Sequence, residues 1–393
     1  MSFDKQNFKT NPNFKFREYP AELRECLGTT YTYDVFKDKQ GRTILITPYW
    51  NINKQCNTEG DPSIGLDQYH YISLIDLSNN KEIQTLIGHT DRVVTCRFFE
   101  DPFKGKQYLI SADRKYKVKV WELTDNGKLI FDKELKEGYD NFIYSVLMIF
   151  EAKKMYAVTS TLGSGETNVF TIDSDQQPKK LQETKDLNIY YLDYWFEEKD
   201  ADGKSVHHII QCGKNKILIT QFNDEKETHY EIATDEKYAN NLCGMVYKKG
   251  DKDLLITSAT RGLIKIIDLK ERKEIHSYEH QDVFFYNFVR WNDQYILLYE
   301  AMQRRILVLD SDNNYKIVSK VLCPEMYYDR FIRKVDHPKY GESILSVGID
   351  WKVKLYCNRN IVKEEVKEDV KEEEKEENKI EEPKAEEKTE ENK

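Results

Sequence analysis

The chain has 393 residues, 60 Lys and Arg against 69 Asp and Glu, and a net charge of −9 at pH 7. This balance argues against binding nucleic acid through bulk positive charge. No run approaches the ~18 apolar residues of a membrane span, and the N-terminus lacks the apolar stretch of a secretory signal. We therefore expect a soluble, intracellular and cytoplasmic protein.

An alternating segment near the N-terminus predicts a strand. Residues Phe14 to Tyr19 alternate apolar with charged side chains and are followed by Pro20. Proline cannot donate a ladder hydrogen bond, so such a strand suits the edge of a sheet. Residues 1–13 are expected to form an arm that precedes it.

The segment from Gly88 to Leu123 contains three strand-like runs, at 93–99, 108–111 and 118–121. The first and third alternate and are rich in β-branched or aromatic residues, and the second is a short apolar run. Turn-forming residues separate the runs, namely Asp101-Pro102 with Gly105, and then Asp113. The segment opens with Gly88-His89 and ends with Trp121-Glu122.

A similar ending, an apolar run followed by an acidic or polar residue, recurs along the chain. The endings fall at positions 76, 122, 173, 223, 268, 310 and 357, so they are 42 to 51 residues apart. An even period of this length is typical of a repeat architecture, in which each unit packs on its neighbours.

The Gly-His opening and Trp-acid ending at this period resemble a WD repeat of the β-transducin type. The resemblance implies an all-β propeller of seven four-stranded antiparallel blades over residues 14–360, with the strand at 14–19 closing the last blade. A count of six or eight blades stays open, because the endings of blades 3 and 4 are the least regular. No cofactor is expected.

In WD repeats a His, a Ser or Thr, an Asp and the Trp form a buried hydrogen-bonded set. Blade 2 supplies His89, Ser111 and Trp121, but Lys115 stands at the place of the Asp, and the nearest carboxylate is that of Asp113. The other matches are Ser346 and Asp350 in blade 7 and His280 in blade 6. These residues are interpreted as structural.

In this architecture the turns between second and third strands share one face with the connections between blades. We call this the loop face. Five of its seven turns are basic, and an exposed Arg or Trp is a favoured interface anchor. The candidate partner-binding residues are Arg114, Lys115, Tyr116, Lys214, Arg261, Arg304, Arg305 and Trp351. Acidic residues in the connections, Asp91 among them, leave open a face of mixed charge.

The segment between Trp50 and His70 is about fifteen residues longer than the corresponding turns of the other blades. It is the second candidate contact element, and plain disorder is an equal alternative. His207, His208, Cys212 and His229 are the one candidate metal set. Adjacent residues of a strand point to opposite faces, so these histidines are interpreted as packing residues. The seven cysteines form no C-x-x-C pattern, and we expect reduced, packed thiols.

Residues 361–393 form a charged tail with 15 acidic residues and 8 lysines, which accounts for −7 of the chain's net charge of −9. Lysines at every fourth position from Lys363 to Lys379 favour an exposed helix, whereas the scarcity of apolar residues favours disorder. A role as a docking peptide for a partner is the third possibility.

Together these features predict a non-enzymatic scaffold or adaptor subunit that holds protein partners or peptides, acidic or phosphorylated ones included, on its loop face. Two alternatives stay open. A phosphoinositide-binding propeller would carry Phe-Arg-Arg-Gly, and here Gln303 and Ile306 flank the arginine pair. A substrate receptor of a ubiquitin ligase would carry Trp-Asp-x-Arg, of which Trp121 to Thr124 departs at two of four positions. The partner and the oligomeric state are not indicated.

Overall fold

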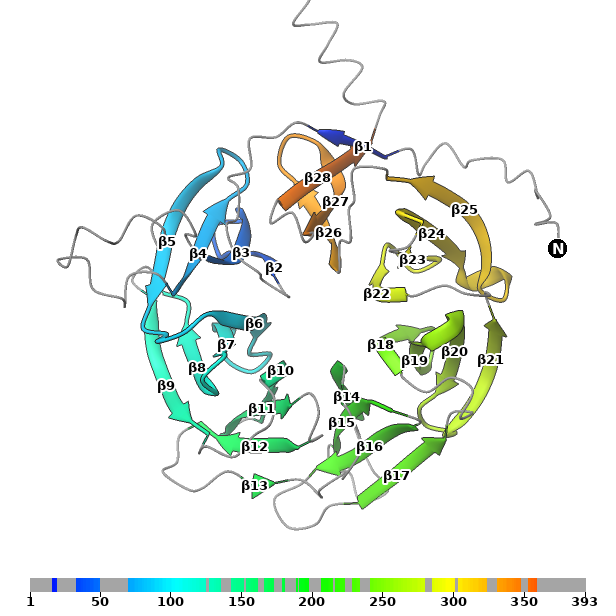
Figure 1. Cartoon of the computed structure of the whole chain (residues 1–393), viewed down its shortest axis with the longest axis horizontal. Coiled ribbons are helices and arrows are strands. Elements are labelled where there is room, and N and C mark those ends of the chain that lie inside the picture. The colour runs from blue at the N-terminus through cyan, green and yellow to red at the C-terminus, as the bar shows by residue number, and fades with distance from the viewer. Residues whose placement is uncertain are drawn as a thin grey trace, which may run out of the picture.

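The computed structural model describes residues 16–19, 33–49, 70–124, 127–135, 143–151, 153–161, 166–172, 179–180, 189, 191–197, 206–214, 216–222, 228–233, 241–279, 285–300, 303–323, 331–347 and 353–358. These residues form seven antiparallel sheets of four strands each. Figure 1 shows the sheets as blades arranged around a ring, with the first strand of each blade innermost. The chain is therefore a seven-bladed β-propeller, and the counts of six or eight are excluded.

The first four blades follow in chain order. Blade 1 is β2 (Asp34–Lys37), β3 (Thr43–Tyr49), β4 (Tyr71–Asp76) and β5 (Lys81–Ile87). Blade 2 is β6 (Val93–Glu100), β7 (Gln107–Asp113), β8 (Lys117–Glu122) and β9 (Lys128–Glu134). Blade 3 is β10 (Ile143–Phe150), β11 (Met155–Thr161), β12 (Thr167–Thr171) and β13 (Lys179–Lys180). Blade 4 is β14 (Tyr191–Glu197), β15 (Val206–Cys212), β16 (Lys216–Phe222) and β17 (Thr228–Ala233).

The remaining blades include two short 3-10 helices. Blade 5 is β18 (Asn241–Lys249), β19 (Lys252–Ala259), η3 (Thr260–Gly262), β20 (Leu263–Asp268) and β21 (Lys273–Glu279). Blade 6 is β22 (Phe285–Arg290), β23 (Tyr295–Glu300), β24 (Arg305–Asp310), η4 (Ser311–Asn313) and β25 (Lys316–Leu322). Blade 7 is β26 (Phe331–His337), β27 (Gly341–Val347), β28 (Val353–Asn358) and, from the other end of the chain, β1 (Phe16–Tyr19).

The N-terminal strand closes the ring. β1 pairs antiparallel with β28, with Phe16 opposite Asn358 and Tyr19 opposite Leu355. Residues 16–19 of the strand predicted at 14–19 thus supply the outer strand of the last blade, next to β28 in a sheet of order β1-β28-β27-β26. Pairing the two ends in this way also covers an outer edge of β28 that would otherwise be open.

The core is divided among the seams between blades. Seven clusters of buried apolar side chains each join two consecutive blades, the last one joining blade 7 to blade 1. We number each seam by its two blades, so that Phe36, Leu74 and Trp121 belong to seam 1/2. Because strands of such a ring are covered on both faces, near-continuous apolar runs such as Ile44–Ile46 are buried throughout.

The inner strands also meet through polar contacts. Each leaves one backbone edge toward the ring's centre, and side chains of the neighbouring blade satisfy some of these groups. Asp34 Oδ2 accepts from Phe98 N at 2.9 Å, and Asp193 Oδ2 accepts from Val246 N at 2.8 Å. Such bonds fix the register of one blade against the next.

The outer strands of blades 1, 2, 5 and 6 carry a β-bulge at one shared position. The residue without a ladder partner is β-branched and apolar in every case, namely Ile83, Ile130, Ile275 and Val318. A bulge twists an edge strand and makes it a poorer template for pairing with another chain.

Candidate protein-interaction face

The turn between β7 and β8 places a carboxylate where the sequence had indicated a lysine. Asp113, at the end of β7, accepts backbone N–H groups from Lys115 at 2.9 Å and Lys117 at 3.0 Å through Oδ1. Its other oxygen lies 3.0 Å from His89 Nδ1. Asp113 therefore takes the role of the WD-repeat aspartate, and Lys115 does not.

His89, Ser111 and Trp121 complete this buried set. His89 Nε2 lies 2.8 Å from Ser111 Oγ, to which the Trp121 indole N–H donates at 3.1 Å. All four side chains are almost fully buried, and burial lowers the pKa of His89 despite the nearby Asp113 carboxylate. Burial thus favours the neutral form of the imidazole, and a hydrogen-bonded network of this kind makes the turn rigid.

The rigid turn presents two cations on the loop face. Arg114 and Lys115 are exposed, and the Lys115 ammonium lies 3.9 Å from Asp91 Oδ2. Arg114 forms no ion pair with any described residue, while its backbone N–H donates to Arg92 O at 3.0 Å. The arrangement offers a guanidinium on a fixed backbone, which is the geometry that carboxylate or phosphate recognition needs.

Tyr116 has a different environment. Its backbone has a φ of +60°, and its ring is partly buried against the apolar cluster of seam 2/3. A left-handed backbone is uncommon outside glycine, so the turn holds this residue in place. Tyr116 supports the turn more than it offers a surface.

The other described candidates divide into exposed and paired residues. Lys214 is exposed at the turn between β15 and β16. Arg304 is partly buried with a φ of +50°, and Cys323 N donates to its carbonyl. Arg305 pairs with Glu300, a fully buried carboxylate whose pKa burial raises, and only 14% of the Arg305 side chain is exposed. That ion pair leaves little of Arg305 for a partner.

Some predicted residues lie wholly or partly outside the described structure. Arg261 is in η3, and its side chain is not among those described. Trp351, His280, Asp350, the segment between Trp50 and His70, the arm at 1–13 and the tail lie outside the described residues. Ser346 is buried on β27.

His70 belongs to this face although the sequence did not single it out. It directly precedes β4 and is partly buried beside blade 2, where burial lowers its pKa and the Asp91 and Asp113 carboxylates oppose that shift. The charged groups near His70 of blade 1 belong to blade 2 and to the connection before it, and spacing along the chain does not reveal such a contact between blades.

The candidate metal set is dispersed by the sheet. His207 contacts Tyr194, whose hydroxyl lies 2.6 Å from Nδ1, whereas His208 stacks on Trp195 at 4.2 Å. Cys212 is fully buried, which raises the pKa of its thiol. Within the described part of the chain, no group of three His, Cys, Asp or Glu side chains has a geometry that could hold a metal ion.

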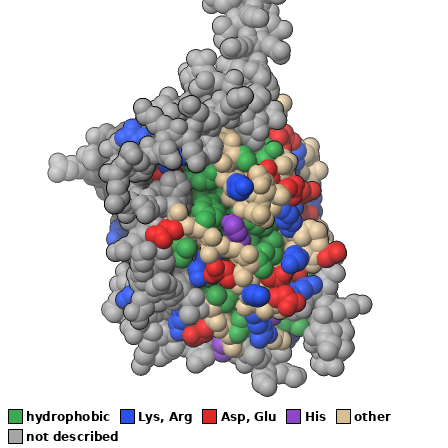
Figure 2. Space-filling model, turned by 90° about the vertical axis from the view of Figure 1, so that its right-hand side faces the viewer, with side chains coloured by type: hydrophobic (Ala, Val, Ile, Leu, Met, Phe, Trp, Pro, Cys, Tyr) green, Lys and Arg blue, Asp and Glu red, His purple; other side chains and the backbone are tan. Residues whose placement is uncertain are grey.

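The outer wall of blades 5 and 6 differs from the loop face. Figure 2 shows basic and acidic side chains interspersed there, with apolar side chains between them. Lys265 pairs with Glu274 at 2.8 Å on this side of blade 5. A wall whose charges neutralise one another offers less attraction to a charged partner than the Arg114 turn does.

No family model matches this chain, and neither does any curated protein. What the structure has in common with WD-repeat propellers is the seven four-stranded blades and the network of blade 2, and no family match confirms WD repeats. Among the described residues, no helix has the length and apolar character to cross a membrane.

Proposed function

We propose that this protein is a non-catalytic scaffold or adaptor that binds protein partners on its loop face. The observation that carries the proposal is the Arg114 turn. There a buried four-residue network holds the backbone of an exposed guanidinium that forms no ion pair within the described part of the chain. Function on a propeller resides in such loops, because the sheets form the framework.

The chemistry of the turn favours an acidic or phosphorylated segment as partner. Arg114 presents a planar donor fork, and Lys115 adds a second cation that Asp91 neutralises in part. Exposed Lys214 adds a cation on the loop face of blade 4. A partner that contacts both Arg114 in blade 2 and Lys214 in blade 4 would have to extend across the ring.

The test is affinity purification of the tagged chain from its own cells, and it compares the partners recovered with the unchanged chain and with its variants. An Arg114→Glu/Lys214→Glu variant is expected to lose one set of partners that the unchanged chain retains. The control is Lys81→Glu/Lys104→Glu, which makes the same charge change at two exposed lysines on the opposite face. The free energy of unfolding of both variants should differ from that of the unchanged chain by less than about 0.5 kcal/mol, because surface substitutions generally have effects of this size.

Two results would overturn the proposal. Partners that survive the Arg114→Glu/Lys214→Glu change would remove the loop face as the contact. The second result is that no protein partner is recovered, while the unchanged chain binds phosphoinositide vesicles and the Arg114→Glu/Lys214→Glu variant does not. That result would assign the loop face to a membrane.

A further inference from the structure

The outer strands of the seven blades differ in how their free edges are protected. Those of blades 1, 2, 5 and 6 carry the β-bulge described above, and each of these four strands begins with a lysine. The outer strands of blades 3 and 7 are short, with two and four residues. Bulges, lysines and short length all hinder an edge strand from pairing with another chain.

The outer strand of blade 4, β17, has none of these devices. Its six residues pair with β16 one by one, without a shift of register, and its sequence THYEIA contains no lysine. Glu231 lies 2.7 Å from the Lys216 ammonium, which neutralises its charge in part. Among the described strands none pairs with the other edge of β17, which lies on the outer rim of the ring (Figure 1). This edge is therefore the least protected one on the rim.

The turn before β16 shows which backbone groups of β17 point outward. Gly213 N donates to Lys216 O at 3.2 Å, so the backbone groups of Lys216 point toward β15. Backbone groups alternate in direction along a strand, and Lys216 lies opposite Ala233. The N–H and C=O groups of His229, Glu231 and Ala233 therefore point away from β16. A strand added at the rim would find its hydrogen-bonding partners there.

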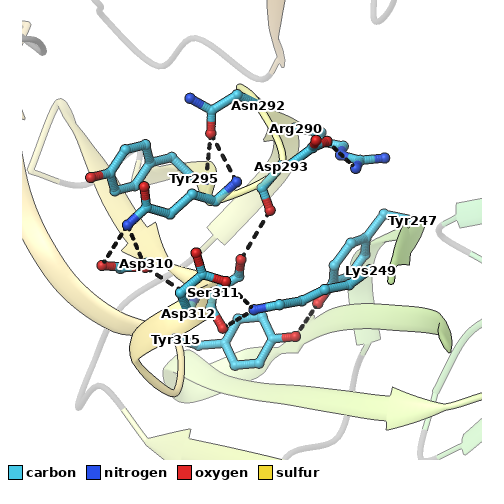
Figure 3. Close-up of polar contacts among 11 residues, drawn as sticks. Tyr247, Lys249, Arg290, Asn292, Asp293, Tyr295, Asp310, Ser311, Asp312 and Tyr315 are labelled. Atoms are coloured by element: carbon cyan, nitrogen blue, oxygen red, sulfur yellow. Dashed lines mark hydrogen bonds and ion pairs between the residues drawn. The ribbon is translucent and has the colours of Figure 1, made fainter. Parts of the chain in front are cut away.

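Contacts with the next blade hold β17 in place. The Arg272 guanidinium lies 4.1 Å from the centre of the Tyr230 ring, and Tyr230 and Ile232 pack against the core of seam 4/5. The outer strand of blade 6 is secured in a comparable way, since the Tyr247 hydroxyl of blade 5 donates at 2.5 Å to that of Tyr315, just before β25 (Figure 3). Because β17 is already fixed, little ordering of this strand opposes the addition of another.

The residues along the edge are complementary to a second copy of themselves. In an antiparallel pair of two β17 strands, residues with outward backbone groups face one another. If Tyr230 faces its own copy, His229 faces Glu231 on both sides of the two-fold axis, and an imidazole can donate to a carboxylate. If Glu231 faces its own copy instead, two carboxylates meet, which is unfavourable. Charge therefore favours the register centred on Tyr230.

We propose that β17 is the contact of a homodimer, in which the β17 strands of two copies pair antiparallel about a two-fold axis at Tyr230. The two four-stranded sheets of blade 4 would then join edge to edge. Such an interface uses the same patch on both copies, so the assembly closes at two. The contact lies on the rim and Arg114 on the loop face, so this inference does not depend on the proposed function.

The test is sedimentation velocity of the purified full chain over about a hundredfold range of concentration. One strand pair buries little surface, so we expect a transient dimer with a dissociation constant of about 10 μM to 100 μM.

Two changes at Glu231 probe the edge. Glu231→Pro removes an outward N–H from each copy without removing a bond to β16, and it should weaken the dimer by at least about tenfold. Glu231→Lys keeps the backbone but removes both carboxylates that face His229, and it should weaken the dimer about tenfold.

Matched controls make the same changes at Glu134, an exposed residue of the bulged strand β9. Leu135 N donates to Tyr116 O at 3.1 Å, so the neighbouring Glu134 N–H also points outward. Glu134→Pro and Glu134→Lys should leave the dissociation constant within about twofold of that of the unchanged chain, because they lie away from β17. Urea denaturation of all four variants verifies that each is folded.

Three results would overturn the dimer. They are a chain that remains monomeric over the whole range, a dimer that both Glu231 variants leave unchanged, and equal losses in the Glu134 variants. If the chain is monomeric and a different protein binds it in a manner that Glu231→Pro abolishes, the edge belongs to that protein and not to a second copy.

Discussion

Blades 2 and 5 have the same four-stranded frame but are secured by different chemistry. By strand register, Ser111, Asp113 and Trp121 of blade 2 correspond to Thr257, Ala259 and Ile267 of blade 5. Blade 2 uses the polar network. Blade 5 instead buries the aliphatic Ile267 at the position of Trp121, and hydrogen bonds of single side chains to the backbone are found there. One is from Thr257 Oγ1 to the Cys243 carbonyl at 2.9 Å. The frame therefore does not require the network, which instead fixes one particular turn.

The largest effect is expected from Asp113→Ala, which gives blade 2 the residue that blade 5 already has at Ala259. His89 and the backbone N–H groups of Lys115 and Lys117 would lose their acceptor. We expect a loss of about 3 kcal/mol in the free energy of unfolding, measured by urea denaturation. The control is Asp293→Ala, at a carboxylate that is 99% exposed, which should cost less than about 1 kcal/mol. Equal costs would show that blade 2 does not depend on its network.

Trp121→Phe is expected to cost about 2 kcal/mol, because it removes both the indole N–H bond to Ser111 and part of a buried ring. The corresponding change in blade 5, Ile267→Val, deletes one methylene and should cost about 1 kcal/mol. Combining Trp121→Phe with Ser111→Ala should cost less than the sum of the single changes, and strict additivity would contradict a shared bond.

Acid should weaken blade 2 through His89. Burial lowers its pKa below the ordinary 6.5, so the unfolded chain binds this proton more readily than the folded chain. Stability is then fully present above pH 6.5 and falls as the pH drops below it, by at most about 1.4 kcal/mol per pH unit for this group. The slope should be shallower in His89→Gln, as followed by thermal melting from pH 7.5 to 5. His208, whose pKa burial lowers to about 4, contributes equally to both chains and cancels in the comparison.

The smallest effect is expected from Thr257→Val, which removes the hydroxyl that bonds to the Cys243 carbonyl while keeping the shape of the side chain. We expect a change below about 1 kcal/mol in calorimetric unfolding, because one neutral hydrogen bond is lost. Ser111→Ala should cost more, since that hydroxyl serves both His89 and Trp121. A larger cost for Thr257→Val than for Ser111→Ala would contradict this, because blade 5 would then depend on its hydroxyl more than blade 2 does.

Much of the fold could be predicted from local sequence. The blade endings depend on alternation and on an acidic or polar residue after an apolar run, and these are features of single strands. Asp76, Glu122, Asp268 and Asp310 each end the third strand of their blade, as the period predicted. The closing strand was also recognisable, because Pro20 marks an edge.

The site was less predictable, because its details depend on backbone geometry and on neighbours from another blade. The spacing from Trp121 predicted that Lys115 stands at the place of the aspartate. Because the backbone at Tyr116 is left-handed, the turn instead brings the Lys117 N–H to the Asp113 carboxylate. The pairing of Arg305 with buried Glu300 follows from two strands lying side by side.

The pairing of β1 with β28 has a consequence for synthesis. About 330 residues of chain separate Tyr19 from Val353, so at ribosomal rates of about 5–20 residues per second the first strand waits roughly 20 to 70 s for its partner. During that interval both β1 and the edges of the half-built ring are open to other chains. Nascent-chain protection by a chaperone would be needed most just before the last blade emerges.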